Sequence, residues 1–215
     1  ATRLAVHEGL VRVTRLADGK TRDVPADHHV VAALERETDF DALPRGESVR
    51  SWKCDLQRDV RQGYWRPGAG ESSGSLRAET HLYRGDFGER KDPVLLHSVV
   101  VGPSGSNGTP VLLTEGARLR VVGRLERSCA VGFGFGTHRL RGVLSGKYAL
   151  SRKIELAGQE EGQFEIELYL DEIPRMKESF PESSVGQELG WMWIQTVRED
   201  VGLEVTSVEL ISKQE

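Results

Sequence analysis

Apolar and polar side chains alternate along most of the chain from residue 80 onward, and this period of two is typical of β-strands. The alternation is strictest where Phe164, Ile166 and Leu168 are interleaved with glutamates. Gly, Pro and Asn break the apolar runs, and no stripe with helical spacing extends over about ten residues. The pattern predicts an all-β fold, in which residues 76–215 form an antiparallel jelly-roll β-sandwich.

One expected strand has two unlike faces. In residues 129–135, Cys129 and every second residue after it are large or apolar, whereas Gly132 and Gly134 leave the other face almost bare. A bare face suits close approach by a second layer or by a ligand. The other strands expected in the sandwich are residues 81–83, 94–101, 111–113, 117–125, 142–150, 154–156, 164–170, 191–197 and 203–211.

Two further segments precede the sandwich. Residues 1–35 form a small β unit, in which Asp18-Gly19 is the centre of a hairpin turn because glycine tolerates the positive φ that such a turn requires. Residues 36–75 are expected to be a linker. The linker aromatics Trp52, Tyr64 and Trp65 are predicted to cover an apolar edge of the sandwich, and exposed ligand-stacking rings are the alternative.

Composition narrows the class of protein. Of the 215 residues, 38% are hydrophobic and 29% are charged, which allows a core of ordinary size. The net charge of −4 and the scattered basic residues disfavour nucleic acid and anionic membranes as partners. No apolar run approaches the ~20 residues of a membrane span, so no membrane insertion is expected. The first residue is Ala1, which indicates a mature product, a proteolytic fragment or a trimmed chain.

The two cysteines leave two interpretations open. Cys54 and Cys129 form one disulfide in an oxidising compartment, or they are two unpaired thiols. They are too few for a zinc site, which needs about four Cys or His ligands.

Catalytic motifs are not found in the sequence. The nucleophile elbow G-x-S-x-G and the zinc motif H-E-x-x-H are both missing, so the sequence predicts that the protein is not an enzyme. A carboxylate pair for glycoside hydrolysis stays open, because its two members need not be close in sequence.

Trp191 and Trp193 are the leading candidates for a binding site. Two residues apart on a strand, they share one face at about 7 Å, which suits adjacent sugar rings. Two core residues, or contacts with another chain, are the alternatives. The lesser ligand-binding candidates are Tyr83, Trp65, His138, Arg139 and Arg141, the last three as hydrogen-bond donors or as a solvated edge.

A structural calcium ion is compatible with the loop acids. Asp86, Asp171 and Glu172 are the candidate ligands, although none belongs to the spaced D-x-D-x-D pattern. No other cofactor is expected.

Two resemblances accompany these predictions. Residues 4–33, LAVHEGLVRVTRLADGKTRDVPADHHVVAA, resemble the C-terminal part of a FecR-like domain of bacterial envelope proteins, with Asp27 or His28 where that family has glycine. The stretches LRVVGRLERSCAVGFGF, GVLSGKYALSRKI, GQFEIELYLDEI and EDVGLEVTSVELI resemble carbohydrate-binding modules and galactose-binding-like jelly rolls. The second resemblance implies binding without catalysis, although many functions share this fold.

The predicted function is therefore a non-catalytic, extracytoplasmic module that binds carbohydrate or an envelope polysaccharide. The alternative is a structural or assembly module of a cell-surface or secreted complex. In that case the N-terminal strands would complete their sheet against a second copy or a partner protein.

Overall fold

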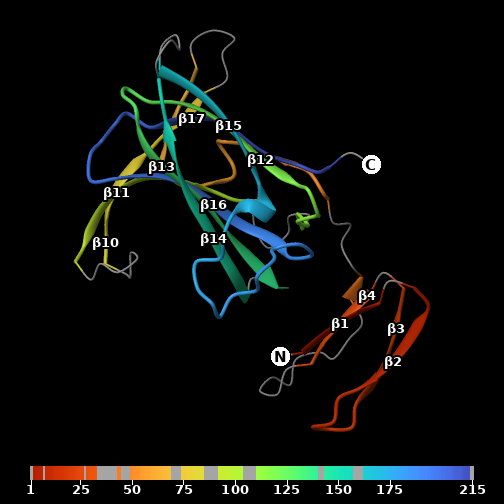
Figure 1. The fold of residues 1–215 in the computed structure, drawn as a ribbon. Coiled ribbons are helices and arrows are strands. Elements are labelled where there is room, and N and C mark those ends of the chain that lie inside the picture. Colours follow the sequence, from red (N-terminus) through yellow and green to blue (C-terminus); the bar gives the residue numbers. More distant parts are fainter. Residues whose placement is uncertain are drawn as a thin grey trace. The chain divides into compact units, whose positions relative to one another are not determined.

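The computed structural model describes residues 2–6, 8–26, 28–32, 43–44, 49–68, 74–84, 92–103, 110–139, 143–156 and 162–213 (Figure 1). The chain divides into two units, Ala1–Ser48 (unit 1) and Val49–Glu215 (unit 2). Regular structure in both units is almost entirely antiparallel strand, joined in unit 2 by the short 3₁₀ helix η2 (Leu170–Glu172). The predicted all-β class is confirmed.

Unit 1 is a set of short strands around a small core. It comprises β1 (Thr2–Val6), β2 (Leu10–Thr14), β3 (Thr21–Pro25), β4 (His28–Ala32) and β5 (Leu43–Pro44), paired in the order β1-β4-β5 and as a β2-β3 hairpin. The hairpin turn is confirmed, because Gly19 has a φ of 70°.

The core of unit 1 is limited. Val6, Val24 and Val30 are buried, whereas Leu10 and Leu16 are 65% and 94% exposed. Such a small sheet gains little from burial. The expectation that these strands pair with another chain stays a prediction.

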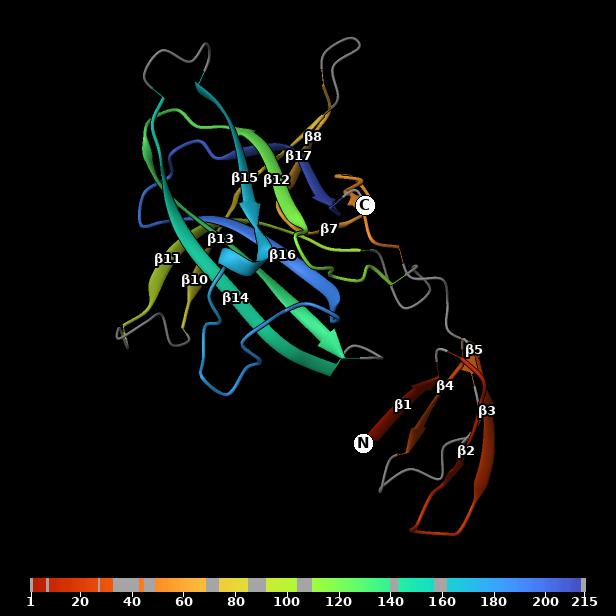
Figure 2. The same cartoon turned by 45° about the vertical axis from the view of Figure 1, so that its right-hand side comes forward.

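Unit 2 is a sandwich of two antiparallel sheets, which lie as separate layers in Figure 2. The first, the β16 sheet, has the order β10-β11-β16-β13-β14, with β7 also paired to β11. Its strands are β7 (Val60–Gln62), β10 (Glu79–Tyr83), β11 (Val94–Val101), β13 (Cys129–Arg139), β14 (Val143–Ile154) and β16 (Glu188–Val197).

The second layer, the β17 sheet, has the order β15-β12-β17-β9-β8, with β6 also paired to β17. Its strands are β6 (Trp52–Lys53), β8 (Tyr64–Arg66), β9 (Ser75–Arg77), β12 (Arg118–Arg124), β15 (Gln163–Tyr169) and β17 (Glu204–Ile211).

The core lies between the two sheets. Val121 and Val208 from the β17 sheet meet Phe133 and Ile194 from the β16 sheet, and all four are fully buried. Val131, Phe133 and Phe135 all point inward, so the predicted packed face of β13 is confirmed. The glycine-bearing face of β13 therefore points away from the core, to the outer face of the β16 sheet.

The structure divides the residues before the sandwich differently from the sequence prediction. Part of the expected linker belongs to unit 2, because β6, β7 and β8 complete the sheets by pairing with β17, β11 and β9. Trp52 packs against the core, as predicted, whereas Tyr64 and Trp65 on β8 are exposed, so the prediction is wrong for these two.

Two expected strand boundaries also change. Residues 142–150 and 154–156 belong to one strand, β14, because β13 pairs with its whole length from Val143 to Ile154. Residues 111–113 contribute bridges, Val111 to Val49 and Leu112 to Glu188, in place of an extended strand.

Both cysteines are free thiols, so the disulfide interpretation is wrong. Cys54 is buried and Cys129 is half-buried. Burial raises the pKa of both thiols, and for Cys54 the carboxylates of Asp59 and Asp55 add to the effect. Neither thiol is set up as a nucleophile at neutral pH.

Candidate functional site

The outer face of the β16 sheet presents a band of aromatic and polar side chains. Paired residues of antiparallel strands point to the same side, so the register shows which side chains are neighbours. One row across the sheet is Val100, Trp193, Gly134 and Ala149, and the next is Ser98, Gln195, Gly132 and Ser151. An apolar row therefore lies beside a polar row.

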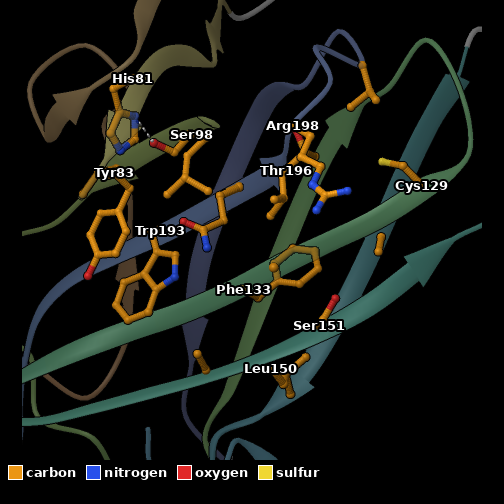
Figure 3. A pocket seen from close by; sticks show the side chains of 18 of the residues that line it. His81, Tyr83, Ser98, Cys129, Phe133, Leu150, Ser151, Trp193, Thr196 and Arg198 are labelled. Atoms are coloured by element: carbon orange, nitrogen blue, oxygen red, sulfur yellow. Dashed lines mark hydrogen bonds between the residues drawn. The ribbon is translucent and has the colours of Figure 1, made fainter. Parts of the chain in front are cut away.

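A cavity of about 830 Å³ lies over this face, and Figure 3 shows it from close by. We call it the outer-face cavity. Among its lining residues are Gln62, His81, Tyr83, Ser98, Arg127, Lys147, Ser151, Met176, Trp191, Trp193, Gln195, Arg198 and Glu199. Its size and its mixture of aromatic and polar side chains are those of a ligand site.

The two tryptophan rings lie over the glycines of β13. A Cβ added to Gly134 would be 2.2 Å from Cζ2 of Trp193, and one added to Gly136 would be 2.4 Å from Cζ2 of Trp191. Figure 3, which looks onto this face, shows the Trp193 ring nearly face-on. One side of each indole is therefore supported by the β13 backbone, and both residues remain partly exposed. The glycine-bearing face of β13 is therefore the surface on which both indole rings pack.

Neighbouring side chains hold the Trp191 ring. The His138 ring lies 5.3 Å from it, centroid to centroid, at a tilt of 52°. Lys147 Nζ lies 5.8 Å from the Trp191 ring centre, a cation–π distance, and Lys147 also lines the cavity. Arg61 Nη2 donates a 2.8 Å hydrogen bond to the carbonyl of Gly190, the residue before Trp191. The ring is thus fixed before any ligand arrives.

The wall formed by β7, β10 and β11 carries a cluster of polar side chains. Gln62 Nε2 donates to His81 Nδ1 at 2.8 Å, and Ser98 Oγ lies 3.4 Å from the same nitrogen (Figure 3). The Tyr83 side chain projects from β10, the strand that also carries His81. These groups, with Gln195 and Ser151, offer donors and acceptors of the kind that hydroxyl groups need.

Three of the predicted binding residues meet at the cavity, namely Trp191, Trp193 and Tyr83. The interpretation of the two tryptophans as core residues is wrong, because the inward positions of β16 belong to Met192 and Ile194. His138 contacts Trp191 from the strand beside it.

The other predicted site residues are elsewhere. Trp65 is on β8 of the β17 sheet, with its ring over Gly74. Asp171 and Glu172 are exposed on η2, and the described residues hold no group of three His, Cys, Asp or Glu suited to a metal. The Arg139 side chain, Arg141 and Asp86 lie outside the described residues. The calcium ion stays a prediction.

Five further lining residues were not predicted from the sequence, namely Gln195, Ser98, Ser151, Lys147 and Arg198. Gln195 had a local signal, since it continues the period of two from Trp191 and Trp193. The others reach the cavity from separate strands or from the end of β16, and only the strand pairing brings them together.

His138 is expected to titrate below the ordinary histidine value of about 6.5. Burial lowers its pKa, and the positive charge of Arg61 lowers it further. The unfolded chain therefore binds the His138 proton more tightly than the folded protein does. The contribution of His138 to the free energy of unfolding is complete above pH 6.5 and declines as the pH falls below that value. An NMR titration of the ring checks the value. Arg61→Gln should raise it, and a His138 pKa at or above 6.5 in the unaltered protein would contradict the prediction.

No family model and no curated protein matches the chain, so the FecR-like resemblance has no support from either comparison. Among solved structures, a family 11 carbohydrate-binding module from Clostridium thermocellum in complex with a β-1,3-1,4-mixed-linked tetrasaccharide is similar. Its identity is 14% and its TM-score 0.39, over 79% of this chain and 99% of that chain.

Two other solved structures are similar at the same low level. The family 11 module of a cellulosomal cellulase of Clostridium thermocellum has 14% identity and a TM-score of 0.38, over 79% of this chain and 98% of that chain. A glycoside hydrolase family 43 arabinoxylan arabinofuranohydrolase from Bacillus subtilis, in complex with cellotetraose, has 9% identity and a TM-score of 0.34. That match covers 96% of this chain and 33% of the other. At these values the likenesses do not establish a function for this chain.

Among the helices of the described residues, none has the length and apolar character needed to cross a membrane.

Proposed function

We propose that unit 2 is a non-catalytic carbohydrate-binding module whose ligand occupies the outer-face cavity. The observation that carries the proposal is the pair of tryptophan rings laid over Gly134 and Gly136, partly exposed beside a row of polar side chains. The C–H face of a sugar ring packs on an aromatic ring, and its hydroxyl groups require hydrogen-bond partners around it. Trp191 and Trp193 would stack the sugars, and Gln195, Ser98 and Ser151 would bind their hydroxyl groups.

The charges at the cavity favour binding over hydrolysis. Glycoside hydrolysis uses two carboxyl groups across the scissile bond. In the part of the lining that the structure describes, Glu199 supplies one carboxylate, and it is ion-paired with Arg127. The lining therefore offers binding groups without an acid and base pair.

An extracytoplasmic location is part of the proposal, because the polysaccharides that such a module would bind are those of the cell envelope and of the cell exterior. Fractionation of the source cells tests this location, and recovery of the chain solely with the cytoplasm would contradict it.

Trp193→Ala is expected to weaken glycan binding about tenfold or more, because the stacking surface and its buried apolar area are lost. The measurement is a glycan array, followed by calorimetric titration of the best ligand with both proteins. Trp65→Ala is the matched control, since Trp65 is 37% exposed on the other sheet and does not line the cavity. Failure of the unaltered protein to bind any glycan, or equal binding by Trp193→Ala, would remove the proposal.

A further inference from the structure

Arg198 has an unusual backbone at the edge of the outer-face cavity. Its φ is 74°, and no other non-glycine residue in the described part of the chain has a positive φ. Its backbone N–H donates to the Leu95 carbonyl at 2.8 Å, which ties this turn to β11. A left-handed arginine is strained, and such strain is concentrated at functional sites.

The Arg198 side chain is available to a ligand. It lines the cavity, it is exposed, and within the described residues its guanidinium has no hydrogen bond or ion pair. Figure 3 shows it among the side chains that line the cavity. The left-handed turn therefore holds a free guanidinium at the cavity.

The cavity carries an excess of positive charge on an acidic protein. Its charged lining residues are Arg127, Lys147, Arg198 and Glu199, and the Arg127–Glu199 pair leaves Lys147 and Arg198 uncompensated. The nearby carboxylate of Asp200 is itself paired with Arg77. The whole chain has a net charge of −4, so the charge at the cavity is opposite in sign to the net charge of the chain.

The two free cations lie on opposite sides of the apolar and polar rows, along the direction of the strands. Lys147 pairs with Gly136, the residue that also pairs with Trp191, whereas Arg198 follows the last residue of β16. At about 3.3 Å per strand residue, the positions of Trp191 and Arg198 are separated by roughly 23 Å. That distance exceeds a single sugar ring and suits an oligosaccharide.

We propose that the outer-face cavity selects an acidic oligosaccharide, one built from uronic acids, with Arg198 and Lys147 binding carboxylates at its two ends. The inference rests on the proposed carbohydrate-binding function. The planar guanidinium matches a carboxylate in a two-bond geometry, which makes Arg198 the specificity-determining residue. The lysine supplies a point charge next to the stacked sugar on Trp191.

The test compares matched charged and neutral ligands on the full chain. Oligogalacturonate and its methyl ester share one backbone and differ in charge, as do glucuronoxylan fragments and unsubstituted xylan fragments. For whichever of these two ligand pairs the protein binds, the acidic ligand is expected to bind about tenfold to a hundredfold more tightly than its neutral counterpart. Its affinity should also fall as the salt concentration rises.

Substitutions at Arg198 separate charge from backbone geometry. Arg198→Gly should fold at least as stably as the unaltered protein, because glycine adopts this φ without strain, and it should lose most of the preference for the acidic ligand. Arg198→Lys should retain part of that preference, since it keeps the charge without the planar fork. Arg152→Gln is the control, because it removes an exposed positive charge from β14 that does not line the cavity.

Three outcomes would overturn the inference. Equal or tighter binding of the neutral members would remove the acidic specificity while leaving a carbohydrate-binding function. An unchanged preference in Arg198→Gly would remove the role of Arg198. Absence of binding to every glycan, acidic or neutral, would instead overturn the proposed function and this inference together.

Discussion

Gly134→Ala is expected to lower the free energy of unfolding by about 1–3 kcal/mol and to displace Trp193 from the floor of the cavity. The added Cβ would lie 2.2 Å from Trp193 Cζ2 and 2.7 Å from the Tyr148 carbonyl oxygen, and neither a supported indole nor a paired backbone can yield cheaply. Replacing glycine also restricts the unfolded chain, which favours folding by about 0.4–1 kcal/mol. The clash is the larger effect. Chemical denaturation and tryptophan fluorescence measure the two consequences.

Gly132→Ala is the matched control for this loss of stability. It lies two residues earlier on the same face of β13, where the added Cβ would be 3.2 Å from Cγ of Gln195, part of a flexible side chain. Its unfolding free energy should stay within about 0.5 kcal/mol of the unaltered protein. If Gly134→Ala is as stable as Gly132→Ala and its fluorescence is unchanged, the ring does not rest on β13.

Tyr148→Ala should be the most destabilising change considered, at about 3–5 kcal/mol, a magnitude typical of removing a large aromatic ring from a core. Tyr148 is 1% exposed and stacks on Phe135 with ring centroids 5.0 Å apart. Its hydroxyl lies 3.0 Å from the Pro181 carbonyl oxygen and accepts from Gln187 Nε2 at 3.1 Å. The ring thus joins β14 to the long connection that precedes β16.

Tyr148→Phe separates the hydrogen bonds from the packing. Loss of the hydroxyl alone is expected to cost about 1–2 kcal/mol, because the half-buried Pro181 carbonyl and the Gln187 amide lose a hydrogen-bond partner. Tyr169→Ala, at an exposed tyrosine on β15, controls for the substitution itself and should change stability by about 0.5 kcal/mol or less. Equal losses for Tyr148→Ala and Tyr148→Phe, measured by urea denaturation, would show that the ring does not contribute through packing.

Local sequence patterns were sufficient to predict several features of the fold. The hairpin at Gly19 follows from two residues, because Asp-Gly favours the turn wherever it occurs. The alternation in β13 and β15 follows from the period of two, which places every second side chain in the core. The linker was harder to predict, because β6, β7 and β8 are short, and their place depends on the sheet edges with which they pair.

Only part of the candidate site could be predicted from the sequence. That Trp191 and Trp193 share a face is a local property of any strand. Which face they occupy is not local, since Met192 and Ile194 make the opposite face equally apolar. The choice depends on β13, where Phe133 and Phe135 fill the core and the glycines opposite them leave room for indole rings outside.

The sequence by itself therefore determined the all-β class, the strand periodicity and the tryptophan pair. The tertiary structure decided that this pair lines a cavity and that Lys147 and Arg198 join it. The physical reason is that strand periodicity is set by the backbone of each segment. A binding face, in contrast, is set by the register between strands that are distant in the chain, such as Gly134 against Trp193.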